Sequence, residues 1–155
     1  MRKIILTSAI MSVILTYVIL LCSCVPQPPK TFIRITDSTG ASWKAIEIRK
    51  ELTYEEAWQA LVDISAKWGV ESMDKDAGYL RTAWVFSTGK DRGTGGPFTY
   101  GKRTTFKFSE DRKTLRIKTE AYYSVPPYGT DYGMDSAFDN DAVSEISGKL
   151  GVGKK

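Results

Sequence analysis

The chain of 155 residues has no histidine, and its two cysteines, Cys22 and Cys24, both lie near its start. Histidine is the commonest general base and a frequent metal ligand in proteins. Its absence excludes Ser-His-Asp and Cys-His catalysis and zinc sites of the Cys/His type. The carboxylates that cluster at residues 74–76 and 131–141 occupy a turn and a helix start, where acidic residues ordinarily occur. The sequence therefore predicts a protein that is not an enzyme and binds no metal ion.

A nucleotide-binding motif is also missing. Residues 96–102 have the glycine and lysine spacing of a phosphate-binding loop, but Arg103 follows where the motif needs Ser or Thr to hold magnesium. A strand pattern continues from there, where the motif needs the N-terminus of a helix. We therefore predict no nucleotide and no other cofactor.

The first 23 residues have the pattern of an export signal. Two basic residues precede an apolar run over residues 4–21, as in the charged and hydrophobic regions of secretory signals. The sequence Leu21-Cys22-Ser23-Cys24 then resembles the lipobox of bacterial lipoproteins, in which the last cysteine receives the lipid. We expect a signal peptide over residues 1–23 and a lipid on Cys24 that holds the mature chain on a membrane. A plain signal peptide and an uncleaved transmembrane anchor are the alternatives.

Cleavage before Cys24 has consequences for charge and location. The one remaining cysteine is consumed by the anchor, so a disulfide within the monomer is excluded, although an exported compartment would permit it. Loss of Arg2 and Lys3 leaves 20 basic and 18 acidic residues, a net charge of +2, which does not favour nucleic-acid binding. Val25 is not the aspartate that retains lipoproteins in the inner membrane of enteric bacteria. We therefore expect a lipid-anchored protein of the outer membrane that faces the periplasm.

The mature chain is long enough for one small domain and a tether. Three prolines within residues 25–30 favour an extended spacer, so residues 24–42 are expected to form the tether. Ile33 and Ile35 alternate with polar residues and predict a short additional strand. Residues 43–150 are expected to form the domain, and residues 151–155 a C-terminal tail.

Two amphipathic helices are predicted in the domain. In the first, Thr53 and Glu56 form a capping box and Gly69 supplies a left-handed stop. The second runs over residues 138–150 and ends at Gly151. The apolar residues that recur three and four apart are Tyr54, Ala57, Trp58, Leu61, Ile64 and Trp68 in the first helix, and Phe138, Ala142, Val143, Ile146 and Leu150 in the second.

The remaining segments alternate between apolar and polar residues, as strands do. In the last two strands the apolar and polar residues occupy opposite faces, which is typical of an antiparallel sheet covered by helices on one side. The predicted fold is α+β, a two-layer sandwich of order β-α-β-β-β-α with two helices on one face of the sheet. The four strands are residues 43–52, 79–86, 98–108 and 115–123; a mobile glycine-rich loop is expected at 87–97, a hairpin turn at 109–114 and a break in the pattern at 125–133.

Outward-facing residues are candidates for an interaction surface. Basic side chains on the open face could meet acidic headgroups or an acidic partner, or could form a solvated face. The tyrosines near Pro126 and Pro127 are typical of recognition surfaces, although they could equally cover the edge of the core; they are Tyr122, Tyr123, Tyr128 and Tyr132. The candidate residues are Arg81, Arg103, Lys107, Arg116, Lys118, Tyr122 and Tyr128.

Several of these motifs resemble a known family. Glu55-Glu56-Ala57-Trp58, Trp68-Gly69-Val70, the run from Asp74 to Thr82, and Trp84 are similar to the repeated domain of the BamC (NlpB) lipoproteins. The resemblance covers about residues 43–150. It implies a helix-grip fold and a non-catalytic, protein-binding accessory role in outer-membrane protein assembly. BamC proteins carry two such domains after a long N-terminal segment that contacts a partner, whereas this chain has one domain after a short tether.

A second function remains open, that of a periplasmic lipoprotein that binds a small ligand or a lipid. Helix-grip folds can leave a groove between the long helix and the curved sheet. Here Trp58, Trp84 and Phe106 are expected to line it, although aromatic residues at such positions more often fill a core.

Overall fold

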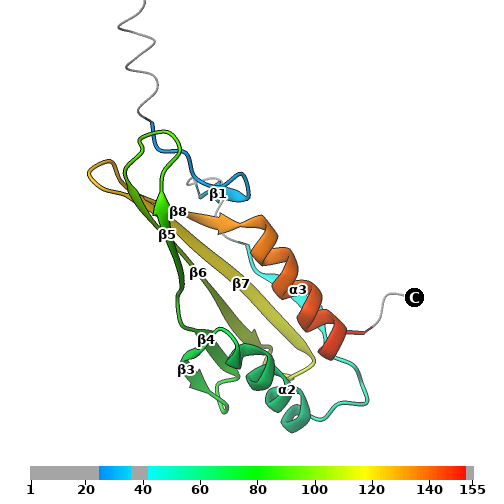
Figure 1. Ribbon diagram of the computed structural model, residues 1–155. Helices are drawn as coiled ribbons and strands as arrows, with labels where there is room; N and C mark the ends of the chain where they lie inside the picture. Colours follow the sequence, from blue (N-terminus) through cyan, green and yellow to red (C-terminus); the bar gives the residue numbers. More distant parts are fainter. Residues whose placement is uncertain (1–24, 36–41, 153–155) are drawn as a thin grey trace, which may run out of the picture.

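The computed structural model describes residues 25–35 and 42–152, which form an α+β fold with one antiparallel sheet of eight strands and two helices (Figure 1). The predicted signal peptide and Cys24 lie outside the described residues. Within them, neither helix has the length and apolar character needed to cross a bilayer. In chain order the elements are β1 Phe32–Arg34, β2 Lys44–Glu47, α2 Tyr54–Ala66, β3 Val70–Asp74, β4 Tyr79–Thr82, β5 Val85–Lys90, β6 Pro97–Phe108, β7 Thr114–Val125, β8 Gly129–Asp135 and α3 Ser136–Leu150.

The long hairpin of β6 and β7 is the centre of the sheet (Figure 1). Its strands pair from Thr99 opposite Ser124 to Phe108 opposite Leu115. Each edge of the hairpin carries two shorter strands that follow one another along it: β4 and β5 pair with β6, while β2 and β8 pair with β7. β3 extends the sheet beyond β4, and β1 extends it beyond β8.

The prediction of four strands is therefore wrong. The strand expected over residues 79–86 divides into β4 and β5, because the pairing with β6 shifts by one residue between Arg81, opposite Thr105, and Val85, opposite Lys102. β5 then continues to Lys90, so much of the loop expected at 87–97 is strand. β3 was not predicted because all its residues are exposed, which leaves no alternation to recognise.

The sequence suggested that the strand pattern breaks at residues 125–133. The sheet instead continues there with β8. The Pro126–Pro127 peptide bond is cis, and the Tyr128 N–H donates to the Val125 carbonyl at 2.7 Å. The hydrogen bond between Tyr128 and Val125 closes a tight turn, in which the chain reverses. β8 then pairs along β7 from Gly129 opposite Val125 to Gly133 opposite Ala121.

Both predicted helices are confirmed. α2 has the capping box, in which the Thr53 N–H donates to the Glu56 carboxylate at 2.8 Å and the Glu56 N–H donates to the Thr53 hydroxyl at 3.3 Å. α3 begins two residues earlier than predicted because the Asp135 carboxylate accepts from the N–H groups of Ala137 and Phe138, each at 3.0 Å. Local capping chemistry thus sets where each helix starts.

The buried side chains form two separate clusters along the hairpin. The first lies under both helices and contains Ile46, Ile48, Ala57, Trp58, Leu61, Ile64, Leu80, Phe106, Phe108, Leu115, Ile117, Ile146 and Leu150. The second lies near the other end of the hairpin and contains Phe32, Tyr100, Ala121, Tyr123 and Val125. The predicted inward faces of β6 and β7 are confirmed, but they are shared between these two clusters.

The N-terminal segment closes the second cluster, so residues 25–35 of the predicted tether pack on the domain instead of forming an extended spacer. Phe32 is buried there, and β1 pairs with β8. The Gln27 N–H donates to the Asp91 carboxylate at 2.7 Å, so the proline-rich segment also lies on the domain. The folded body thus begins well before residue 43. It extends past residue 150 as well, because the Val152 N–H donates to the Glu47 carbonyl at 3.0 Å.

Candidate functional site

The face of the sheet opposite the core carries a row of aromatic side chains. On β6 and β7, residues that alternate with the buried ones project to this side, which we call the outer face. Four neighbouring strands contribute register partners to one level of the sheet: Phe86 on β5, Gly101 on β6, Tyr122 on β7 and Tyr132 on β8. With Trp84, the three aromatic residues of this level form the aromatic row.

Tyr122 is the centre of the aromatic row. Its ring lies over Gly101, where a Cβ atom would be 2.5 Å from the ring carbon Cε1. The ring of Trp84 meets it edge to face with centroids 5.0 Å apart, while Phe86 and Tyr132 each lie 6.2 Å away. Phe86 and Tyr132 remain 57% and 65% exposed. The glycine thus permits a packed centre whose two ends face solvent.

A network of ion pairs adjoins the row. The Arg103 Nε lies 2.9 Å from the Glu120 carboxylate, and the Arg103 guanidinium lies over the Trp84 ring, 4.4 Å from its centroid. Arg81 on β4 pairs with Glu71 on the neighbouring strand β3 at 3.0 Å. Lys118 lies 3.5 Å from Glu120. Three of the predicted basic residues are therefore paired with carboxylates, so much of the basic charge on the outer face is balanced.

Lys107 and Arg116 lie apart from the aromatic row. They are direct cross-strand partners near the turn between β6 and β7, and both are exposed. Within the described residues, neither has a carboxylate oxygen within 4.0 Å. They border a shallow hollow of about 680 Å³ that also includes Glu110 and Asp111. The hollow therefore has mixed charge.

Tyr128 is separated from the other candidates. It lies in the turn between β7 and β8 and is 54% exposed. The structure thus distributes the predicted surface over three places. Sequence reasoning named Tyr122 and Tyr132 but missed Phe86 and Trp84, because only the register of β5 and β8 brings Phe86 and Tyr132 beside Tyr122. It also named Tyr123, which is buried in the second cluster instead.

The groove expected between helix and sheet is not formed by the predicted residues. Trp58 and Phe106 are buried in the first cluster, whereas Trp84 lies on the outer face against Tyr122. The three side chains therefore lie on opposite sides of the sheet. The small-ligand alternative loses the observation that motivated it.

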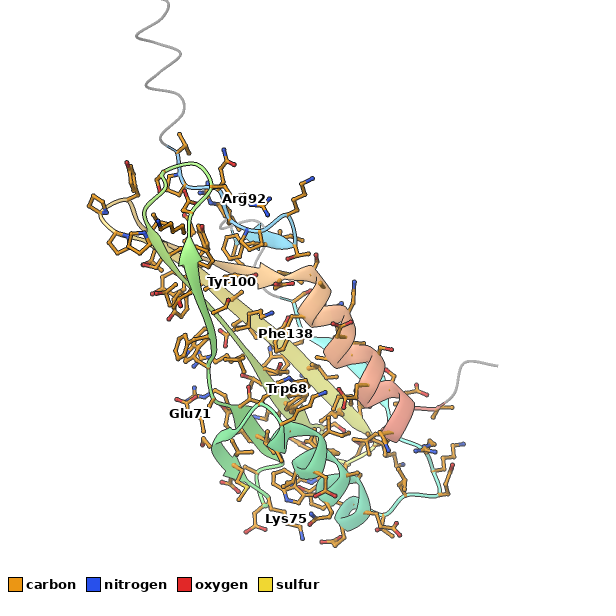
Figure 2. The ribbon with its side chains drawn as sticks, in the orientation of Figure 1. Trp68, Glu71, Lys75, Arg92, Tyr100 and Phe138 are labelled. Atoms are coloured by element: carbon orange, nitrogen blue, oxygen red, sulfur yellow. The ribbon has the colours of Figure 1, made fainter. Side chains whose placement is uncertain are left out.

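Buried carboxylates are engaged by structural donors. The hydroxyl of Tyr100, which is labelled in Figure 2, donates to Asp135 at 2.6 Å. Lys102 lies 3.8 Å from the same carboxylate. Burial raises the pKa of Asp135, but the bonds from Tyr100 and the Phe138 N–H, with the charge of Lys102, outweigh it and hold that pKa below its ordinary value.

Asp139 has similar partners, because the Thr119 hydroxyl donates to it at 2.7 Å and Lys44 pairs with it. These contacts join α3 to the sheet. Among the described residues there is no group of three or more acidic or cysteine side chains placed to hold a metal ion. The geometry of these carboxylates therefore indicates structural roles.

Comparison of the chain with protein-family models, with curated protein sequences and with solved structures finds no match.

Proposed function

We propose that this chain is a bacterial lipoprotein, held on the outer membrane by a lipid on Cys24, that binds a protein partner through the aromatic row without catalysing a reaction. The observation that carries the proposal is the alignment of Phe86, Tyr122 and Tyr132 at one level of the sheet, with the two outer rings more than half exposed. Aromatic side chains are enriched in the centres of protein interfaces and among their energetically dominant residues.

The surroundings of the row support recognition of a protein. The next level of the sheet on one side presents four hydroxyls, from Thr88, Thr99, Ser124 and Thr130. The ion pairs of Arg103 lie on the other side. An apolar centre between polar borders is the usual anatomy of an interface. Because the rings are already packed on a sheet, binding would order few side chains, and its entropic cost would be small.

We further propose a helix-grip arrangement and an accessory role in outer-membrane protein assembly, by analogy with the BamC family. Support comes from the antiparallel sheet, the two helices that share one cluster of buried residues, and the lipobox at the start of the chain. The analogy concerns fold and location, whereas the binding surface is argued from the aromatic row itself.

Affinity purification from detergent-solubilised membranes tests the partner. The tagged full chain is expected to recover a component of the outer-membrane assembly machinery. The double substitution Phe86→Ser and Tyr132→Ser should abolish this recovery, whereas Tyr128→Ser, which changes an exposed tyrosine outside the row, should leave it intact. Recovery of no assembly component would contradict the accessory role, and equal recovery with the double variant would contradict the surface.

The anchor has an independent test. Mass spectrometry of the N-terminal peptide should show a lipid on Cys24, and Cys24→Ala should release a folded, soluble domain. Persistent membrane attachment of the variant would contradict lipid anchoring.

A further inference from the structure

A hollow of about 520 Å³ lies between the N-terminal segment and the turn that joins β5 to β6. Three cationic side chains line it: Lys30 from the N-terminal segment, Lys90 from the end of β5 and Arg92 from the turn. Phe98 and Tyr123 form an aromatic wall. We call this hollow the basic pocket.

The three cations have no paired carboxylate within the described part of the chain, since the ion pairs found there involve other residues. Asp91 lies between Lys90 and Arg92 in the sequence, but its side chain is turned inward and the residue is only 2% exposed. Its carboxylate accepts from the Tyr123 hydroxyl and from the N–H groups of Gln27, Gly93 and Thr94. Three cations thus line the hollow, and the one carboxylate beside it, that of Asp91, is held by hydrogen bonds from the hollow's own walls and from the turn.

The pocket lies next to the expected anchor. Gln27, which is bound to Asp91, is three residues from Cys24, and a chain spans at most about 3.6 Å per residue, so the two lie within roughly 11 Å. A Cβ atom on Gly93 would collide with the carbonyl of Val25, so the turn also packs against the residue that follows Cys24. The headgroup region of a bilayer is about 5–8 Å thick on each side. A lipid on Cys24 would therefore keep the pocket close to the headgroup layer.

The turn between β7 and β8 lies at the same end of the molecule as the basic pocket (Figure 1). Figure 1 shows the start of the described chain, the β5–β6 turn and the β7–β8 turn together at one end of the molecule, and Figure 2 places Arg92 there. The two turns adjoin, since a Cβ atom on Gly96 would lie 3.9 Å from the Pro126 carbonyl oxygen. Tyr128 projects from the second turn, 54% exposed, and tyrosine is a residue favoured at membrane interfaces.

We infer that the basic pocket binds the phosphate group of an anionic phospholipid in the membrane to which Cys24 is anchored. The guanidinium of Arg92 offers paired donors for phosphate oxygens, and the two ammonium groups add charge without geometric demands. Attachment through acyl chains is strengthened by basic residues at the surface. The lipid on Cys24 and the phosphate in the basic pocket would together fix the orientation of the domain on the membrane. The inference rests on the proposed lipid anchor, but not on the proposed partner.

Chemical acylation of lysines in the full, lipidated chain tests this inference. The chain is reconstituted into vesicles of phosphatidylcholine alone or of phosphatidylcholine with phosphatidylglycerol, and the rate at each lysine is read by mass spectrometry. Lys30 and Lys90 should react severalfold more slowly in the anionic vesicles. Lys113, in the β6–β7 turn, is the internal reference and should react equally in both.

A matched pair of variants makes the assignment specific. Arg92→Gln removes one cation from the pocket and should weaken the protection of Lys90 about fivefold. Arg116→Gln removes an exposed arginine from the far part of the hairpin and should leave the protection unchanged. Equal loss of Lys90 protection in Arg92→Gln and Arg116→Gln would show a general effect of charge. It would overturn the basic pocket as the binding site.

The remaining outcomes separate the possible sources of phosphate. Equal protection by inorganic phosphate, added to vesicles of phosphatidylcholine alone, would overturn the lipid in favour of a free anion. Unchanged lysine rates under all conditions would overturn the inference altogether. The N-terminal peptide from the same samples reports lipidation separately, so an unmodified Cys24 would instead contradict the proposed anchor.

Discussion

The Tyr123 hydroxyl donates a hydrogen bond of 2.6 Å to the Asp91 carboxylate, and this contact joins the central hairpin to the start of the folded chain. The same carboxylate accepts from the Gln27 N–H at 2.7 Å and the Thr94 N–H at 2.6 Å. Because Asp91 is almost fully buried, these bonds form away from competing water. One side chain therefore holds the start of the described chain on the domain.

Removing that hydroxyl should loosen the N-terminal segment. Tyr123→Phe keeps the ring in the second cluster but deletes a hydrogen bond to a buried charge, so the free energy of unfolding should fall by about 1.5–3 kcal/mol. Urea denaturation measures the loss, and hydrogen exchange at the Gln27 amide should accelerate. Tyr132→Phe, a matched change on the outer face, should alter neither quantity. Unchanged exchange at Gln27 in Tyr123→Phe would contradict the proposed role of the contact.

The free energy of unfolding should depend on pH through the Asp91 carboxyl group. Burial raises the pKa of Asp91, but the bonds from Tyr123, Thr94 and Gln27 outweigh it and hold that pKa far below its ordinary value. A carboxyl whose pKa is lower in the folded state stabilises the fold above its unfolded pKa of about 3.9. That contribution is lost as the pH falls below this value towards the folded pKa.

Urea denaturation from neutral to acidic pH measures this dependence. The pKa values of Glu56, Asp111 and Asp135 are lowered as well, so the share of Asp91 requires a variant. Asp91→Asn should be less stable than the native chain at neutral pH, and the difference should shrink below about pH 4. A difference that stays constant over this range would refute the assignment.

Two glycines should respond oppositely to alanine. At Gly101 the added methyl group would meet the Tyr122 ring at 2.5 Å, so Gly101→Ala should cost about 1–3 kcal/mol of unfolding free energy and displace the ring. Gly148 lies inside α3 with no atom within 4 Å of the added group, so Gly148→Ala should stabilise by about 0.5–1 kcal/mol. Urea denaturation measures both. A neutral or stabilising Gly101→Ala would show that the ring does not depend on the glycine.

The start of α2 should depend on its capping box. Thr53→Ala deletes the hydroxyl that accepts from the Glu56 N–H and should lower the free energy of unfolding by about 1 kcal/mol. Thr53→Ser retains that oxygen and should be nearly neutral. Thermal denaturation followed by circular dichroism compares the variants, and equal effects of the two substitutions would exclude the hydroxyl as the cause.

The helices and the buried side of the hairpin could be predicted because their signals are local. Thr53 and Glu56 are three residues apart, and the alternation along β6 and β7 needs no knowledge of neighbouring strands. β3 and β8 could not be predicted in this way. β3 is exposed throughout, and most of β8 is exposed or only partly buried, so pairing of their backbones with adjacent strands defines them rather than an apolar pattern.

The aromatic row could be predicted only in part. Tyr122 stands out as an outward-facing tyrosine, but its neighbours come from strands whose register the sequence does not contain. Trp84 is the clearest example, because a tryptophan in a strand is usually assigned to the interior. The one-residue shift in pairing between β4 and β5 places Trp84 on the outer face instead.

The central proposal is that the aromatic row is the surface that binds a protein partner. Site-specific photo-crosslinking in intact membranes tests it most directly. A photoreactive amino acid is placed at position 86 or 132 and, as the control, at position 50, which is exposed in the connection between β2 and α2. The proposal predicts one cross-linked product, containing an outer-membrane assembly component, from positions 86 and 132 and none from position 50. No product from positions 86 and 132, or the same product from all three positions, would contradict it.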